Sequence, residues 1–153
     1  MMGFPITERY SLDWQKLGFQ GKDPATDFRS MGMLALDDLC HYVKIHKKQC
    51  FESVRIFDSY AIVGISITAY CLRLLRTRHL SAFFYMTEVN VDSYHEFYCF
   101  CFVKFGEFWL SKGDKASIHT FSQYFKDFQI DFETNMILSE PESFYQDFKQ
   151  TLA

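Results

Sequence analysis

The sequence predicts an all-α fold: a single compact bundle of about five to seven helices around an aromatic-rich core. Apolar residues recur at helical spacing through most of the 153 residues. Only 7 Gly and 3 Pro interrupt the chain, so few breaks are expected. Apolar residues make up 48% of the chain and include 18 Phe and 9 Tyr. Each buried aromatic side chain removes roughly 150–250 Å² from water, so this composition favours an aromatic core.

Five segments carry apolar residues at steps of three, four or seven, which is typical of helices buried on one face. In chain order they are Leu36 to Val54, Ala61 to Leu75, Tyr94 to Phe108, Ile118 to Phe128 and Phe144 to Leu152. Within the second segment, Ile62 to Thr68 is rich in β-branched residues and could form a strand on propensity alone. A helix is favoured because the uncharged run is long for a strand and continues into Arg73 without a turn signal.

Two prolines indicate helix starts. Asp23-Pro24 fits an N-cap residue followed by the first residue of a helix. Ser139 and Glu142 are spaced like a capping box, with Ser139 as the cap.

Charge and motifs exclude several classes of function. The net charge is -3 and no basic block dominates, so a nucleic-acid partner is not expected. The signatures GxxxxGK[ST], GxGxxG, HExxH and GxSxG are absent, which argues against the usual small-molecule enzymes. The longest uncharged run, Ser59 to Leu72, is shorter than the about 20 residues of a membrane span. We therefore expect a buried core element there and no direct membrane anchor.

The cysteines and histidines do not suggest a metal site. The five Cys form no CxxC pair, and Cys99 and Cys101 are two residues apart, which places them on different faces of a helix. His41 and His46 are five apart and poorly placed for shared ligation. Met1 to Tyr10 has no apolar segment of the secretory type. Free thiols in a cytoplasmic protein, with no metal, are the expectation.

The most informative stretch runs from Trp14 to Leu39. Gly18 and Gly21 flank an aromatic residue, which predicts a shaped turn. Asp23 and Asp27 suit the start of a helix, but Arg29 places a cation near the positive end of the helix dipole. A residue that breaks the local rule needs another reason to be there. Apolar side chains would pin the turn to the core, namely Trp14, Leu17, Phe19 and Phe28.

This stretch resembles the ELMO domain family, whose pattern is a Trp, an aliphatic-GFQ element, a DP pair, a TDFR element and a helix with periodic Leu. Here those elements are Trp14, Leu17 to Gly21, Asp23-Pro24, Thr26 to Arg29 and Leu36 to Leu39, with Met31 to Met33 before the last. Further matches are Tyr60 to Thr68, Phe97 to Cys99 and Trp109. The resemblance is strongest over residues 8–130 and implies a single ELMO domain over 1–153.

The resemblance implies roles for individual residues. In the ELMO-domain-containing branch, proteins activate GTP hydrolysis by Arf and Arl GTPases, and the arginine of the TDFR element, here Arg29, is required. Gln20, Thr26, Asp27 and Ser30 would bind the partner or orient the arginine. The motif would be supported structurally by Trp14, Gly18, Phe19, Pro24, Phe28 and Gly32. Ser30 departs from the Gly that is usual in that branch.

The implied mechanism is stabilisation in trans of the charge that develops on the transferring γ-phosphoryl group, an effect worth about 10³–10⁵ in rate. No cofactor of the chain's own is expected, because GTP and Mg²⁺ belong to the partner GTPase. One alternative is the engulfment and cell-motility branch, whose members are non-catalytic scaffolds for DOCK-type activators of Rac. Another is that Arg29 merely forms a salt bridge with Asp23, Asp27 or Asp37, which would contribute about 0–1 kcal/mol.

Two further expectations follow from the resemblance. The protein would work in the cytoplasm and reach internal membranes through the GTPase. Domains of this family commonly follow further helices, and only thirteen residues precede Trp14. An alternative is therefore that upstream helices complete the core.

Overall fold

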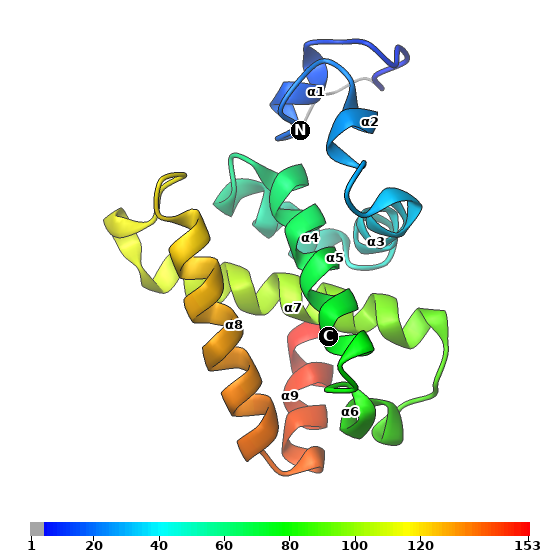
Figure 1. The fold of residues 1–153 in the computed structure, drawn as a ribbon, viewed down its shortest axis with the longest axis vertical. Coiled ribbons are helices and arrows are strands. Elements are labelled where there is room, and N and C mark those ends of the chain that lie inside the picture. Colours follow the sequence, from blue (N-terminus) through cyan, green and yellow to red (C-terminus); the bar gives the residue numbers. More distant parts are fainter. Residues whose placement is uncertain (1–4) are drawn as a thin grey trace. The chain divides into compact units, whose positions relative to one another are not determined.

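The structure is a computed structural model that describes residues 5–153. All regular elements of the described chain are helices, which confirms the all-α prediction (Figure 1). The chain divides into two units, which are residues 5–72 and 73–153 of the described chain. Helix α5 (Tyr60–Arg76) begins in the first unit and ends in the second.

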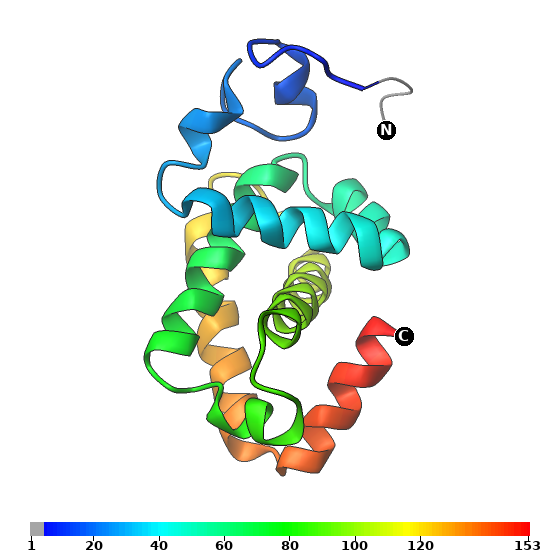
Figure 2. The same ribbon diagram turned by 90° about the vertical axis from the view of Figure 1, so that its right-hand side faces the viewer.

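The first unit contains two short helices followed by longer ones. They are α1 (Asp13–Lys16), α2 (Pro24–Asp27), α3 (Gly32–Ile45), α4 (Lys47–Ile56) and the greater part of α5. Helix α3 packs against α4. Figure 2 shows α3 from the side, with α1 and α2 preceding it as separate turns of helix. The Trp14 to Arg29 stretch therefore precedes α3 in the chain and consists of short helices and the turns that join them.

One predicted helical segment is divided in two. The periodicity from Leu36 to Val54 is helical on both sides, but His46 leaves the helical conformation with φ -111° and ψ 55°. No Gly or Pro marks this break, so composition did not predict it. By contrast, Ile62 to Thr68 lies wholly within α5, so the helix is observed and the strand alternative is wrong.

The second unit carries the aromatic core. Its elements are α6 (Ser81–Met86), α7 (Val91–Ser111), a 3₁₀ turn (Gly113–Lys115), α8 (Phe121–Leu138) and α9 (Pro141–Leu152). Helix α7 packs against α8 and α9, and α6 packs against α9. Phe100 of α7 is 1% exposed, and its ring centroid lies 5.8 Å from that of Phe132 and 5.5 Å from that of Phe148. The predicted aromatic stripes therefore interlock in this unit, and the aromatic-rich core is confirmed.

Two details of the helix ends differ from prediction. Ser139 does not cap α9, because α8 extends to Leu138 and Ser139 terminates it. Glu140 precedes α9 instead, in the extended conformation that a residue before proline favours. Ile118 lies outside α8 and is 75% exposed, so it does not extend the apolar stripe of that helix.

No single helix in residues 5–153 is both long and apolar enough to cross a bilayer. Helices α4 and α5 pass the same test of length and composition only as a pair, and the pair is bent by 113°.

Candidate functional site

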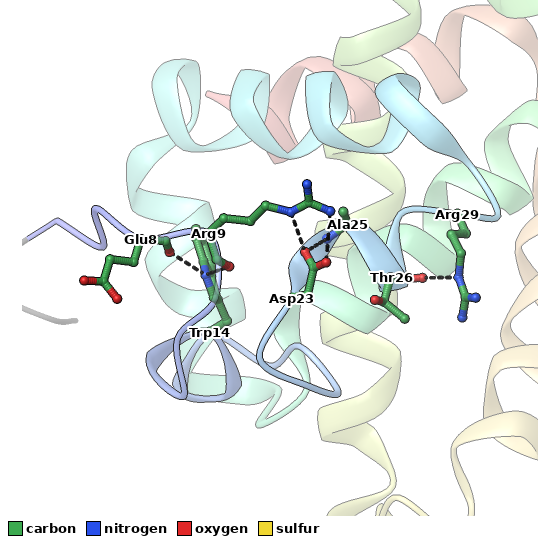
Figure 3. A network of polar contacts seen from close by, with 7 residues as sticks. All are labelled: Glu8, Arg9, Trp14, Asp23, Ala25, Thr26 and Arg29. Carbon is green, nitrogen blue, oxygen red and sulfur yellow. Dashed lines mark hydrogen bonds and ion pairs between the residues drawn. The ribbon is translucent and has the colours of Figure 1, made fainter.

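Three aromatic rings support the motif. The Trp14 and Phe19 ring centroids lie 5.7 Å apart, and those of Phe19 and Phe28 lie 5.6 Å apart, both in edge-to-face geometry. The Trp14 indole Nε1 donates to the backbone oxygens of Glu8 at 3.2 Å and Arg9 at 2.9 Å (Figure 3). All three rings are half-buried. They connect α1, the following turn and the end of α2 into one supported surface.

Gly18 fixes this surface to the start of α5. Its backbone is left-handed, with φ +84°, a conformation that favours glycine. A Cβ atom built there would lie 2.5 Å from the Tyr60 backbone nitrogen and 2.6 Å from the Ser59 carbonyl carbon. The Leu17 carbonyl oxygen accepts from the Ala61 N–H at 3.3 Å. The turn therefore contacts the backbone of α5 directly, and a side chain at Gly18 would separate them.

Asp23 caps α2 as the sequence predicts. Its Oδ1 accepts from the Ala25 N–H at 3.1 Å, and Pro24 is the first residue of the helix. Arg9 adds a two-point contact: its Nε donates to Asp23 Oδ1 at 3.2 Å and a terminal nitrogen donates to Oδ2 at 3.0 Å (Figure 3). The hydrogen bond from Arg9 is the largest cause of a lowered Asp23 pKa, and the Ala25 N–H contributes.

Gln20 and Asp27 contact each other, but in the described chain neither of them forms a hydrogen bond with Arg29. The Gln20 backbone N–H donates to Asp27 Oδ2 at 3.0 Å, and the Gln15 side-chain amide donates to the Gln20 carbonyl oxygen at 3.2 Å. The Gln20 side chain is exposed. Asp27 therefore closes the turn between α1 and α2, and the Gln20 side chain is available to a partner.

Arg29 is exposed and is held by one backbone atom. Its Nε donates to the Thr26 carbonyl oxygen at 2.9 Å, and its terminal nitrogens lie on the side of the guanidinium away from Thr26 (Figure 3). Within the described chain the terminal nitrogens of Arg29 have no hydrogen-bond or ion-pair partner. The carboxylate of Asp23 is engaged by Arg9, and that of Asp27 by Gln20. The alternative in which a salt bridge to an aspartate fixes Arg29 is therefore wrong for this structure.

The backbone after Arg29 explains the Ser30 substitution. Gly32 has φ +58°, and its N–H donates to the Phe28 carbonyl oxygen at 2.6 Å. Arg78 is the one non-glycine residue of the described chain with a positive φ, so Ser30 does not need the conformational freedom of glycine. The Ser30 side chain is exposed. The left-handed position of this loop is Gly32, and the chain retains Gly there.

Beside Arg29 lies a largely apolar hollow of about 570 Å³, which we call the arginine groove. Arg29, Arg9 and Asp23 supply its charged groups. Its apolar lining consists of Trp14, Phe19, Pro24, Ala25, Phe28, Met33 and Leu36. Within residues 8–32 of the described chain, no three His, Cys, Asp or Glu side chains converge on one point. Outside this stretch, the ring centroids of His41 and His46 lie 6.3 Å apart, so the prediction that their spacing keeps them from shared ligation is wrong. The groove therefore offers a guanidinium beside apolar surface.

Arg9 and Gln15 are site residues that sequence reasoning missed. Arg9 donates to Asp23, fourteen residues further along the chain, and Gln15 donates to the backbone of Gln20, five residues further along. Their contacts depend on the turn that returns the chain between α1 and α2, where the Ser11 N–H donates to the Lys22 carbonyl oxygen at 3.0 Å. Periodicity carries no signal for such pairs. In the sequence, the only sign of the Arg9–Asp23 contact is that the two side chains carry charges of opposite sign.

Comparisons with known proteins give one consistent result. Residues 4–125 match the model of the ELMO/CED-12 family. ELMO domain-containing protein B of Dictyostelium discoideum is 37% identical over 132 residues, covering 83% of this chain and 46% of that protein. ELMO domain-containing protein 2 of Mus musculus is 34% identical over 128 residues, covering 78% of this chain and 43% of that protein.

ELMO domain-containing protein 1 of Mus musculus is 30% identical over 145 residues and is covered to 44% of its length. The chain therefore spans less than half the length of these relatives. No solved structure matches. The family match covers most of the chain, including the Trp14 to Arg29 stretch and all of α7, and it shows that the chain belongs to the ELMO/CED-12 family.

Proposed function

We propose that this protein stimulates GTP hydrolysis by a small GTPase of the Arf/Arl type, and that Arg29 supplies positive charge to the transition state. The observation that carries the proposal is the state of the Arg29 side chain. It is exposed, it is oriented by the Thr26 carbonyl oxygen, and its terminal nitrogens are unused within the described chain. A guanidinium in this state can donate directed hydrogen bonds to phosphoryl oxygens at little cost in reorganisation.

The surroundings of Arg29 support contact with a protein better than contact with a small substrate. The arginine groove is open and apolar, and Met33 at its edge is 67% exposed. An apolar surface beside a charged group is typical of the centre of a protein interface. GTP and Mg²⁺ would be bound by the partner. The protein would act in the cytoplasm and reach internal membranes through the GTPase.

Single-turnover GTP hydrolysis measured across a panel of Arf and Arl proteins tests the proposal. The wild-type chain is expected to accelerate hydrolysis by at least one member. Arg29→Ala is expected to lower that acceleration by about 10³-fold or more, because the loss of a transition-state charge is of that order. Arg29→Lys should rescue little, since an ammonium does not reproduce the planar pair of donors.

Arg55→Ala is the matched control, because Arg55 is an exposed arginine on α4 in the same unit and is not part of the arginine groove. It should retain full stimulation. Unchanged helical content by circular dichroism would show that Arg29→Ala is folded. Equal activity of Arg29→Ala and wild type would refute the catalytic role.

A non-catalytic scaffold is the second candidate, favoured by the apolar face that α3 exposes. Met33 is 67%, Leu36 37% and Val43 42% exposed, and their spacing places them along one side of the helix. Such a face can receive a partner helix. A chain that stimulates no GTPase of the panel but binds a DOCK-type protein, with binding lost in Met33→Glu, would establish this candidate instead.

A further inference from the structure

A second hollow in the first unit does not include Arg29 in its lining. It has a volume of about 600 Å³ and lies among α3, α4, the start of α5 and the Leu17–Phe19 turn; we call it the α3–α5 pocket. Its α3 lining includes Leu36, Leu39 and Val43. A volume of 300–1,000 Å³ with mainly apolar walls is characteristic of small-ligand sites.

The interior polar groups of this pocket satisfy each other. Cys50 is 2% exposed, and its Sγ lies 3.2 Å from the Tyr60 hydroxyl. Burial raises the pKa of the Cys50 thiol, so the thiol is neutral near pH 7. The interior thus presents no charge and requires no polar ligand atom. A ligand that enters it must be apolar along most of its length.

Charged groups occur only at the edge of the pocket. Lys16 is engaged by Asp13, whose Oδ1 lies 2.6 Å from its Nζ. Lys44, at the end of α3, is exposed and makes no hydrogen bond or ion pair with any residue that the structure describes. Asp58 is an exposed acid on the same edge. A ligand with one anionic end would therefore be attracted to Lys44 and repelled by Asp58, which defines one orientation.

We propose that the α3–α5 pocket binds a single long-chain fatty acid, with the alkyl chain inside and the carboxylate at Lys44. A liquid water molecule occupies ~30 Å³, and if each methylene takes the same volume, a chain of about 16 carbons needs roughly 500 Å³. This requirement is of the same order as the volume of the pocket, about 600 Å³. The proposal does not depend on the GTPase-activating function, because Arg29 does not line the pocket.

Titration with cis-parinaric acid, a fluorescent fatty acid of 18 carbons, tests the proposal on the purified chain. Saturable binding of one molecule per chain, displaced by palmitate, is expected. Val43→Trp should abolish parinarate binding, because the larger side chain fills part of the pocket. Val43 is 42% exposed, so the fold should tolerate this change. Lys44→Glu should weaken binding at least about tenfold, since an attraction becomes a repulsion. Lys48→Glu is the matched control and should bind like wild type, because Lys48 is exposed on α4 and does not line the pocket.

Two further arms define the ligand. Palmitate methyl ester should displace the probe at least about tenfold less well than palmitate; equal displacement would overturn the role of Lys44. Vesicles of phosphatidylcholine alone should not bind the chain; co-sedimentation with them that Val43→Trp abolishes would identify a bilayer surface and overturn the fatty-acid proposal.

Absence of saturable parinarate binding by the wild-type chain would also overturn the proposal. So would a concentration-dependent dimer that Val43→Trp dissociates, because the occupant would then be a second copy. Circular dichroism of each variant separates loss of binding from loss of fold. Arg29→Ala should bind parinarate normally, so failure of the catalytic proposal leaves this one standing.

Discussion

At Gly18 two separate constraints act on one residue: the backbone is left-handed, and the Tyr60 nitrogen and Ser59 carbon occupy the space of a Cβ. Gly18→Ala is expected to lower the free energy of unfolding by about 2–4 kcal/mol, because it adds backbone strain to overlap with a backbone that cannot rotate away. Urea unfolding followed by circular dichroism measures this. Gly21→Ala is the matched control, since nothing lies within 4 Å of its Cβ position, and it should leave the midpoint nearly unchanged.

The Arg9–Asp23 pair gives the first unit a defined response to acid. The pKa of Asp23 is lowered from its ordinary 3.8, mainly by the hydrogen bond from Arg9, so its stabilising contribution is fully present above pH 3.8. That contribution is lost as pH falls through the lowered pKa of the folded state. Wild type should therefore exceed Asp23→Asn in stability at pH 6, and the difference should shrink below pH 3.8. A difference in urea midpoints that stays constant down to pH 2 would contradict this.

Helices α3 and α5 are linked by a buried polar contact. The Thr68 hydroxyl, on α5, donates to Oδ2 of Asp38, on α3, at 2.8 Å, and both residues are 0% exposed. Thr68→Val preserves shape but removes one donor from a buried carboxylate, so a loss of about 1–3 kcal/mol in unfolding free energy is expected. Thr68→Ser retains the hydroxyl and should lose less. Chemical denaturation of the three proteins decides this, and equal stability of Thr68→Val and wild type would show that the contact is unimportant.

Helix α7 organises the second unit through Phe100. Its ring contacts Phe132 of α8 and both Phe144 and Phe148 of α9 at centroid distances of 5.5–5.8 Å. Phe100→Ala is expected to cost about 3–5 kcal/mol, the usual range for removing a buried aromatic ring. Phe100→Leu keeps most of the apolar volume and should cost clearly less. Thermal unfolding monitored by near-ultraviolet circular dichroism would report on the aromatic core directly.

Across the whole molecule, helix type was predictable because burial on one face imposes a period on the sequence. Phe97, Phe105 and Phe128 all lie where the aromatic stripes predict, in α7 and α8, and all are buried. The break at His46 was not predictable, because it involves neither Gly nor Pro and depends on how α3 and α4 pack. The N-cap of α9 was misplaced for a similar reason: propensity does not say which of two adjacent residues, Ser139 or Glu140, precedes the helix.

The candidate site was predictable in part. The cap at Asp23 and the need for glycine at Gly18 follow from local chemistry, which a sequence displays directly. The contact from Arg9 and the closing of the turn by Asp27 join residues seven to fourteen positions apart, and only the folded backbone brings them together. The exposed end of Arg29 likewise depends on which acids have already been engaged by other donors.

Phe19, Phe28 and Leu36 line both the arginine groove and the α3–α5 pocket, so one wall separates the two hollows. A molecule on either side that displaces these side chains alters the space on the other side. Thermodynamic linkage then requires reciprocity: an occupant that raises or lowers the affinity of its neighbour is itself affected by the same factor. Two ligands that are not in contact would in this way change each other's affinity through the phenyl rings of Phe19 and Phe28.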